Sequence, residues 1–194
     1  RRGEQGDLVL VCGEAAYRGQ FADEVGIASL HAGRILAAFP ELVRYLRAYR
    51  PDAMLSTLTF ANVIATWACR WVQNPPRLVL RESNTVSAIS KQSSGLKYRL
   101  IPYLIRWFYP WADQVITVSK AAGEDLIQTT GVSSDLVSTI YNPVVTDELF
   151  EEAEEPLDHS WFTDEAPPVV LGVGRLEPQK DFETLIREIG RAHV

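Results

Sequence analysis

Short apolar runs and longer amphipathic stretches follow one another along this 194-residue chain. The apolar runs are rich in Val, Ile and Leu, a pattern typical of parallel strands buried on both faces. The amphipathic stretches carry apolar residues every three or four positions, which predicts helices. The pattern predicts strands at residues 7–12, 25–30, 52–57, 77–82, 114–118 and 168–174, and helices at 34–49, 60–72, 96–109 and 121–130.

The regular alternation of strands and helices predicts an α/β fold with a doubly wound, Rossmann-like parallel sheet. Pro102 interrupts helix 96–109, while Ser119 and Gly131 are the expected N-cap and stop signal of helix 121–130. Helix 34–49 is expected to bury one side, formed by Ile35, Leu36, Phe39, Leu42, Val43 and Leu46.

Charge is unevenly distributed within the formal net charge of −6. Residues 70–120 hold eight Lys or Arg and two acidic side chains, whereas residues 121–194 hold four basic and sixteen acidic ones. Residues 147–165 contain no basic residue and are interrupted by proline. Such a stretch before a new strand is typical of an interdomain connection, and a solvated acidic helix and loop is compatible with the same composition.

The segment GVGRLEPQKDF, residues 172–182, places two cations between a predicted strand and a predicted helix. Ligands of open α/β sheets bind beyond the carboxyl ends of the strands. A backbone that can approach a ligand at Gly174, the guanidinium of Arg175 and the ammonium of Lys180 suit a diphosphate clamp. The alternative is a solvated loop with two surface cations. The residues expected to start the following helix and to form its buried side are Asp181, Leu185 and Ile186.

This segment resembles the start of the second domain in the group 1 (family 4 type) retaining glycosyltransferases of the GT-B fold, where G-R-L-x-x-x-K follows a strand. The resemblance implies that Arg175 and Lys180 hold the diphosphate of a nucleotide-sugar donor beside Gly174. Residues 111–145 resemble the end of the first domain in the same family. That second resemblance implies interdomain positions for Ser119 and Asn142, with Pro143 standing where the family usually has Gly.

The resemblance implies a chain truncated at both ends. Residues 1–146 are expected to form an acceptor-side Rossmann-like domain without its first strand, and residues 147–167 an acidic linker. Residues 168–188 are expected to begin the nucleotide-sugar-binding domain. Residues 189–194, IGRAHV, match one reading frame of a common sequencing adapter and are interpreted as a non-native tail; the alternative is a helix that ends at Gly190.

The loop after the strand at residues 77–82 reads RESNT, where the family often has a pattern like S-E-H-N-T. The resemblance places Ser83 at the His position and assigns Glu82, Ser83 and Asn84 to recognition of the acceptor or sugar. The alternative is a turn whose backbone is satisfied by Asn84 and Thr85. No catalytic residue is identified, because retaining transfer in this family is generally drawn without an obvious protein nucleophile.

Basic and aromatic residues are interleaved in residues 91–111, KQSSGLKYRLIPYLIRWFYPW. Such a helix can dock on an anionic bilayer with its rings at headgroup depth. The alternative is a core helix that buries Leu100, Leu104 and Trp107 and exposes its cations. Nucleic-acid binding is disfavoured because the flanking regions are neutral to acidic.

The remaining titratable residues indicate no metal or cofactor. His31, His159 and His193 lie far apart without metal-ligand spacing. Cys12 and Cys69 sit in apolar segments and are interpreted as small buried hydrophobes in a reducing compartment. No signal peptide or membrane-spanning run is evident, so the expected location is cytoplasmic, with peripheral contact at the inner face of the membrane.

The sequence therefore predicts a retaining glycosyltransferase that moves a sugar from a nucleotide-diphosphate sugar to the hydroxyl of a saccharide or lipid-linked acceptor. The expected setting is envelope polysaccharide or glycolipid biosynthesis, with the nucleotide-sugar as substrate and the 194-residue chain inactive by itself. The alternative is a non-catalytic Rossmann-like binding or interaction domain in which Arg175 and Lys180 are surface charges.

Overall fold

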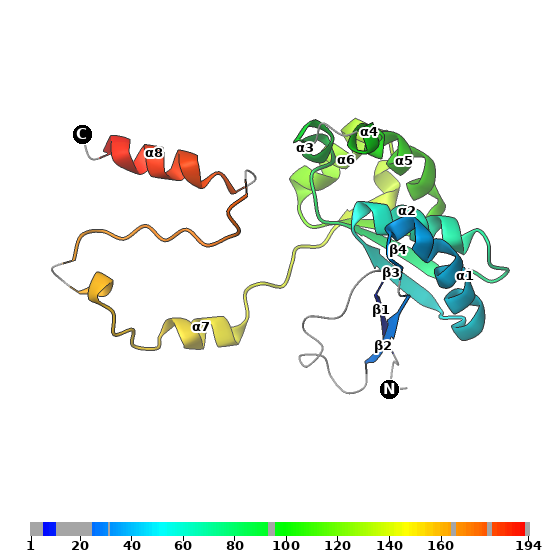
Figure 1. Ribbon diagram of the computed structural model, residues 1–194, viewed down its shortest axis with the longest axis horizontal. Helices are drawn as coiled ribbons and strands as arrows, with labels where there is room; N and C mark the ends of the chain where they lie inside the picture. Colours follow the sequence, from blue (N-terminus) through cyan, green and yellow to red (C-terminus); the bar gives the residue numbers. More distant parts are fainter. Residues whose placement is uncertain are drawn as a thin grey trace. The chain divides into compact units, whose positions relative to one another are not determined.

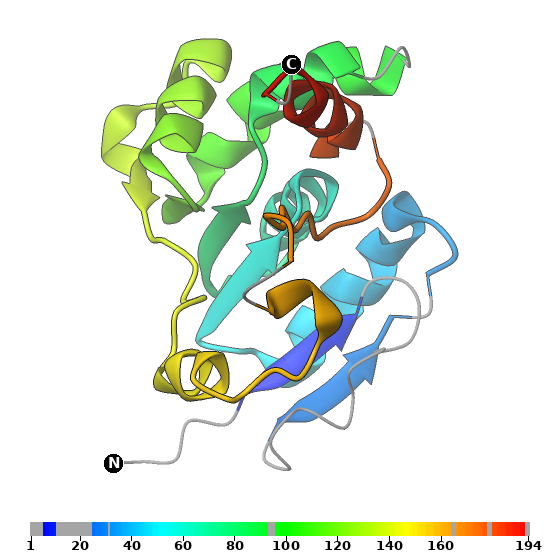
Figure 2. The same ribbon diagram turned by 90° about the vertical axis from the view of Figure 1, so that its left-hand side faces the viewer.

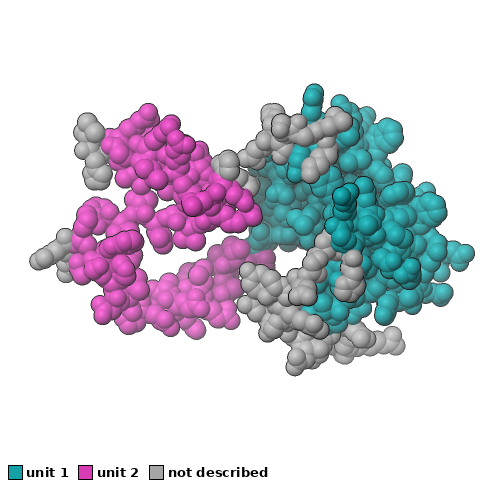
Figure 3. All heavy atoms as spheres, in the orientation of Figure 1, with its two compact units in different colours: residues 1–142 teal, residues 143–194 magenta. Residues whose placement is uncertain are grey.

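The computed structural model describes residues 6–10, 25–30, 32–92, 96–163, 166–177 and 180–192. The chain divides into two compact units, Arg1–Asn142 and Pro143–Val194, which Figure 3 shows in separate colours. The division falls four residues before the domain boundary predicted at residue 146.

Two parallel sheets form the framework of the first unit. The larger one has the order β3 (Ala53–Thr57), β4 (Arg77–Glu82), β5 (Gln114–Thr117) and β6 (Val137–Thr139), and the smaller one pairs β1 (Asp7–Leu10) with β2 (Gly26–Ser29). The register places Arg81 between Thr57 of β3 and Ile116 of β5. All strand pairs are parallel, which confirms the predicted Rossmann-like α/β class.

Six helices in the described part of the first unit connect these strands or flank them. Because strands β3 to β6 follow one another in chain order, right-handed crossovers put the connecting helices on the same face of the sheet. Figures 1 and 2 show α1 and α2 on one side of β3 and β4. The helices are α1 (Ala38–Tyr49), α2 (Thr59–Cys69), α3 (Val86–Gln92), α4 (Leu96–Arg99), α5 (Ile101–Phe108) and α6 (Lys120–Thr130), with 3-10 turns at Ile35–Ala37, Tyr109–Trp111 and Ser134–Leu136.

Alternation along β4 separates a buried face from a more open one. Leu78, Leu80 and Glu82 are buried, whereas Arg77 is exposed and Val79 and Arg81 are half-buried. On the open face, Leu55 of β3 is 65% exposed. The core therefore lies between the sheet and helices α2, α5 and α6, and its fully buried members include Leu80, Ile105, Tyr109, Val115 and Leu126.

Local signals of the first unit are mostly confirmed. The Ser119 hydroxyl accepts a hydrogen bond from the Ala122 amide at 3.2 Å, and Gly131 ends α6 with φ of 74°. Pro102 lies in the first turn of α5 and separates it from α4, as the interrupted pattern predicts. Leu36 is an error of the prediction: it is 70% exposed because residues 35–37 form a 3-10 turn, which changes the helical phase.

Cys69 is buried, as predicted, and desolvation, with the charge of Asp113 second, raises the pKa of its thiol to about 11. An elevated thiol pKa leaves little thiolate at neutral pH, so this residue behaves as a hydrophobic side chain. Cys12 lies outside the described residues.

In the described part of the second unit, the regular elements are α7 (Asp147–Ala153), a 3-10 turn at Ser160–Phe162 and α8 (Phe182–Ala192). Thr146 caps α7 by accepting a hydrogen bond from the Leu149 amide at 3.4 Å. The acidic stretch thus contains a solvated helix, which agrees with the solvated acidic helix and loop that its composition allows. Every side chain described between residues 147 and 163 is exposed.

Two predictions and one alternative for the second unit are wrong in this structure. Residues 168–174 form no strand, because no strand among the described residues lies beside them to exchange backbone hydrogen bonds, and Val173 is 83% exposed. Helix α8 continues through Gly190 rather than ending there. Ile186 is 69% exposed, while Phe182 and Leu185 pack close to Gly172, so the inward side of α8 is rotated from the predicted one.

Candidate functional site

The carboxyl ends of β3, β4 and β5 bring the predicted loop and part of the predicted interdomain set to one edge of the sheet. Thr57 ends β3, Glu82 ends β4 and Thr117 ends β5. Ser83 and Asn84 follow β4 directly, and Asn142 reaches this edge from the segment after β6. This is the edge at which parallel α/β sheets bind ligands.

Arg81 is the central cation of this edge, and no motif singled it out. Its Nη1 donates to the Ser83 hydroxyl at 2.8 Å and to the Thr57 hydroxyl at 3.3 Å. Its Nη2 donates to Oδ1 of Asn142 at 2.7 Å. The predicted positions Ser83 and Asn142, which lie 59 residues apart in the chain, therefore share one guanidinium.

Glu82 lies beneath the loop, on the opposite face of β4 from Arg81, and is fully buried. Its carboxylate accepts hydrogen bonds from the Thr59 hydroxyl at 3.0 and 3.1 Å and from the Tyr109 hydroxyl at 2.7 Å. The backbone of Ser83 and Asn84 also hydrogen-bonds to it. Glu82 therefore fixes the loop from below rather than facing solvent.

Burial dominates the electrostatics of Glu82. Desolvation raises the pKa of its carboxyl above the ordinary 4.5, against the hydrogen bonds from Tyr109, Thr59 and the loop backbone, which lower it. The pKa of Tyr109 is also raised, first by desolvation and then by the charge of Glu82. The Nδ2 amide of Asn62 donates to the Tyr109 hydroxyl at 3.1 Å, while its Oδ1 is buried without a hydrogen-bond partner.

The backbone at the end of β3 is strained. Leu58 has φ of 77°, a left-handed conformation that costs a non-glycine residue about 1 kcal/mol or more. It stands directly between Thr57, which contacts Arg81, and Thr59, which contacts Glu82. This backbone conformation lets Thr57 and Thr59 contact opposite faces of β4. The sequence pattern did not predict the positive φ of Leu58.

The two cations of the predicted clamp, Arg175 and Lys180, are both exposed. A Cβ atom added at Gly174 would lie 3.4 Å from the aliphatic carbons of Lys180, so the lysine stem lies over this glycine. Arg175 Nη1 forms an ion pair with Glu177 Oε1 at 3.0 Å, with 80% of the arginine side chain exposed. The stem of Lys180 thus lies close to Gly174, and the charge of Arg175 is shared with a carboxylate.

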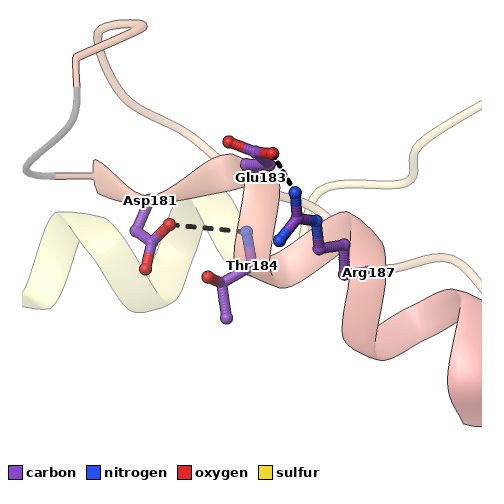
Figure 4. A network of polar contacts seen from close by, with 4 residues as sticks. All are labelled: Asp181, Glu183, Thr184 and Arg187. Carbon is purple, nitrogen blue, oxygen red and sulfur yellow. Dashed lines mark hydrogen bonds and ion pairs between the residues drawn. The ribbon is translucent and has the colours of Figure 1, made fainter.

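Asp181 begins α8 in a way that the sequence half predicts. It has φ of 48° and its Oδ1 accepts a hydrogen bond from the Thr184 amide at 3.4 Å, so it caps the helix instead of lying in its first turn. Figure 4 shows this contact together with the Glu183–Arg187 ion pair one turn later. The cap ends the loop that carries Lys180 and turns the chain into the helix.

Helix α5 presents an exposed aromatic face. Tyr103 is 65% and Trp107 71% exposed, and the guanidinium of Arg70 lies 5.3 Å from the ring centroid of Trp111. The buried face consists instead of Ile101 and Ile105, continued by Tyr109. The core-helix alternative is right for Leu104, which packs against the core, and wrong for Leu100 and Trp107, which face solvent.

No helix within the described ranges is long and apolar enough to cross a membrane. Over the same residues, no cluster of three His, Cys, Asp or Glu side chains suits a metal ion. His159 accepts a hydrogen bond from the Trp161 amide through Nδ1 at 3.1 Å, a local contact within its own turn. His31 and His193 lie outside the described residues.

Comparison with known proteins identifies the family of this chain. The chain matches Glycosyltransferase Family 4 over residues 7–148. It is 31% identical over 140 residues to the N-acetylgalactosamine-N,N'-diacetylbacillosaminyl-diphospho-undecaprenol 4-alpha-N-acetylgalactosaminyltransferase of Campylobacter jejuni, an alignment that covers 72% of this chain and 36% of that protein. The chain therefore belongs to Glycosyltransferase Family 4.

A solved structure supports the fold. Anabaena HepE, crystallised in complex with UDP and glucose, is 17% identical and superposes with a TM-score of 0.51 over 77% of this chain and 49% of its own. The chain thus spans about a third of its curated relative and about half of this structure. The family match contains the sheet edge with Arg81 and Glu82 but ends before the Arg175–Lys180 loop.

Proposed function

We propose that the whole protein transfers a sugar from a nucleotide-diphosphate sugar to an acceptor hydroxyl with retention of anomeric configuration. The observation that supports this best is the presence, in one chain, of a family 4 match over residues 7–148 and a G-R-L-x-x-x-K loop downstream of it. In the proposal, Arg175 and Lys180 bind the donor diphosphate, and their charges serve the role that Mg²⁺ has at many phosphate sites.

The acceptor proposed is a saccharide linked to a lipid diphosphate, in envelope polysaccharide or glycolipid assembly. The name of the Campylobacter relative describes an acceptor carried on diphospho-undecaprenol. Ser83 and Asn84 are half-buried at the sheet edge, where their polar groups can hydrogen-bond a sugar. Glu82 serves them by holding the loop backbone, and the interdomain positions Ser119 and Asn142 frame the same edge.

We further propose that the exposed face of α5 contacts an anionic bilayer at the cytoplasmic side. Exposed Tyr103, Trp107 and Trp111 are the residue types found at headgroup depth, and Arg99 and Arg106 supply positive charge beside them. A lipid-linked acceptor would be reached from that position. No nucleic-acid partner is proposed.

The ion pair between Arg175 and Glu177 favours the second candidate, a non-catalytic binding domain in which these cations are surface charges. An exposed pair of this kind stabilises by about 0.2 to 1 kcal/mol, less than a charge-assisted bond to phosphate contributes. A diphosphate can therefore displace Glu177, and the enzyme remains the proposal. The 194-residue chain by itself is expected to show no transfer, because it spans 36% of its curated relative.

The decisive experiment uses the full-length protein with its correct donor. Arg175→Ala and Lys180→Ala should each lower kcat/KM, because each removes a charge-assisted phosphate contact. The expected loss of transition-state stabilisation is about 2 to 4 kcal/mol for each variant. Arg187→Ala is the matched control, since Arg187 is also exposed on the second unit and paired with Glu183. Unchanged kinetics in both clamp variants would refute the donor role, and an inverted product anomer would refute retention.

Membrane contact is tested by sedimentation of the full-length protein with anionic and neutral vesicles. Arg99→Glu and Arg106→Glu should each weaken binding to anionic vesicles by at least about 1 kcal/mol, and added salt should weaken it further. Trp107→Ala should weaken it too, whereas Trp161→Ala, a 60% exposed tryptophan of the second unit, should not. Equal recovery with both kinds of vesicle would argue against the electrostatic contact.

A further inference from the structure

Arg81 is held in place by neutral oxygens alone. Its three recorded partners are two hydroxyls and one side-chain amide, from the end of β3, the loop after β4 and the segment after β6. Fixing a guanidinium through three separate segments removes much of the side-chain freedom that ligand binding would otherwise have to restrict. These bonds use three of its five N–H groups, which leaves two for a ligand.

The positive charge of Arg81 has no carboxylate partner among the described residues. The ion pairs recorded there join Arg44 to Glu41, Arg175 to Glu177, Arg187 to Glu183 and Arg191 to Glu188. The neighbouring Glu82 points to the opposite face of β4, where Thr59 and Tyr109 bind it. Arg81 therefore keeps its full charge for an incoming anion, whereas Arg175 shares its charge with Glu177.

The position of this charge indicates what it binds. Arg81 lies at the carboxyl edge of the parallel sheet, beside Ser83, which the resemblance places where the family often has a His. Its Nη1 lies 2.8 Å from the Ser83 hydroxyl. The guanidinium therefore places beside this loop a positive charge that the neutral side chain of Ser83 cannot supply. A planar guanidinium matches the oxygens of a phosphate, and the substrates of the proposed reaction carry diphosphates.

We propose that Arg81 binds a phosphate group of a diphosphate-bearing substrate, positioned by Thr57, Ser83 and Asn142, and that this substrate is the lipid-linked acceptor. The choice of acceptor rests on the proposed function, in which the donor diphosphate belongs to Arg175 and Lys180. Arg81 is a binding residue in this proposal and takes no part in proton transfer. Asn142, the last residue of the first unit, positions it and does not itself contact the phosphate.

The test measures binding of inorganic pyrophosphate, farnesyl diphosphate and UDP to the full-length protein by calorimetry at low salt. Arg81→Gln should weaken farnesyl diphosphate binding by about ten- to a hundred-fold, the loss expected for a charged hydrogen bond, remove one of the sites that bind pyrophosphate, and leave UDP binding unchanged. Arg77→Gln is the matched control, because Arg77 is an exposed arginine at the opposite end of the same strand. It should bind all three ligands like the wild type.

A second variant covers the case in which Arg81→Gln fails to fold. Ser83→Ala combined with Asn142→Ala keeps the charge but removes two of its three supports, and should weaken farnesyl diphosphate binding by a few-fold while Arg81→Lys loses more. Unchanged binding of pyrophosphate and farnesyl diphosphate in folded Arg81→Gln would overturn the phosphate site. Loss of UDP binding alone would overturn the acceptor assignment in favour of the donor.

These outcomes are separable from those of the proposed function. Binding of farnesyl diphosphate requires no sugar transfer. If Arg81→Gln weakened this binding in a protein without transferase activity, the phosphate site would be supported and the proposed enzymatic function would be refuted. Conversely, sugar transfer could depend on Arg175 and Lys180 while Arg81→Gln changes neither transfer nor farnesyl diphosphate binding. That result would refute the phosphate site and support the proposed enzymatic function.

Discussion

The two units differ in how far along the chain their polar contacts reach. In the first unit, Arg81 contacts Asn142 across 61 residues and Asn62 contacts Tyr109 across 47. In the described part of the second unit, every recorded side-chain hydrogen bond or ion pair joins residues at most four positions apart. The candidate site of the first unit is therefore tertiary, and the cation loop of the second is local.

This difference explains why the sequence identified Arg175 as a candidate binding residue but did not identify Arg81. Arg175 belongs to a motif of fixed spacing, so a short segment suffices to find it. Arg81 lies within an ordinary strand pattern, and only segments more than twenty residues away reveal that its charge is uncompensated. A motif reports residues that a family keeps together, whereas an unpaired guanidinium can only be recognised from its surroundings.

The largest expected effect tests the difference in packing. Ile105→Ala in the first unit should lower the free energy of unfolding by about 2 to 5 kcal/mol, because Ile105 is fully buried in the core. Val173→Ala in the same 194-residue chain should change it by less than about 0.5 kcal/mol, because Val173 is 83% exposed. Urea titration followed by circular dichroism compares them. Similar losses in both variants would show that the second unit has a core of its own.

The next prediction concerns the buried carboxylate that supports the loop. Since burial raises the folded-state pKa of Glu82 above its ordinary 4.5, its contribution to stability is complete below that value and is lost as the pH rises through the raised pKa. The free energy of unfolding of the wild type, relative to Glu82→Gln, should therefore fall as the pH rises above 4.5. Urea titrations at several pH values measure this difference, and a pH-independent difference would contradict the raised pKa.

Two glycines compare the units at the level of the backbone. Gly131 has φ of 74°, so Gly131→Ala should destabilise the first unit by about 1 kcal/mol. Gly190 is helical and a Cβ atom there would meet nothing within 4 Å, so Gly190→Ala should raise the helix content of α8, worth up to about 1 kcal/mol. Thermal unfolding and far-ultraviolet circular dichroism report the two effects. A stabilised Gly131→Ala variant would contradict the left-handed cap.

The smallest expected effect tests whether Glu177 competes for Arg175. Glu177→Gln removes an exposed ion-pair partner worth about 0.2 to 1 kcal/mol, so the full-length protein should bind UDP up to about five-fold more tightly. Glu183→Gln, which removes the partner of Arg187, is the control and should leave UDP affinity unchanged. Tighter binding in neither variant would mean that Arg175 is not the residue that meets the diphosphate.

Most of the framework of the first unit could be predicted from the sequence. The strand Arg77–Glu82, the Ser119 cap and the Gly131 stop have the predicted bounds, because hydrophobic period and capping chemistry are local properties. The strand predicted at residues 168–174 failed for the opposite reason. A strand exists only beside a partner, and no described strand lies there.

The sequence by itself determined the α/β class, the order of most elements of the first unit, the family and the spacing of Gly174, Arg175 and Lys180. Only the tertiary structure decided that Glu82 points into the core under its loop, that Trp107 faces solvent, and that Arg81 meets Ser83 and Asn142 at the sheet edge. The physical reason is that propensity, periodicity and capping act between neighbours in the chain. Burial and charge compensation depend instead on which distant segments fold against one another.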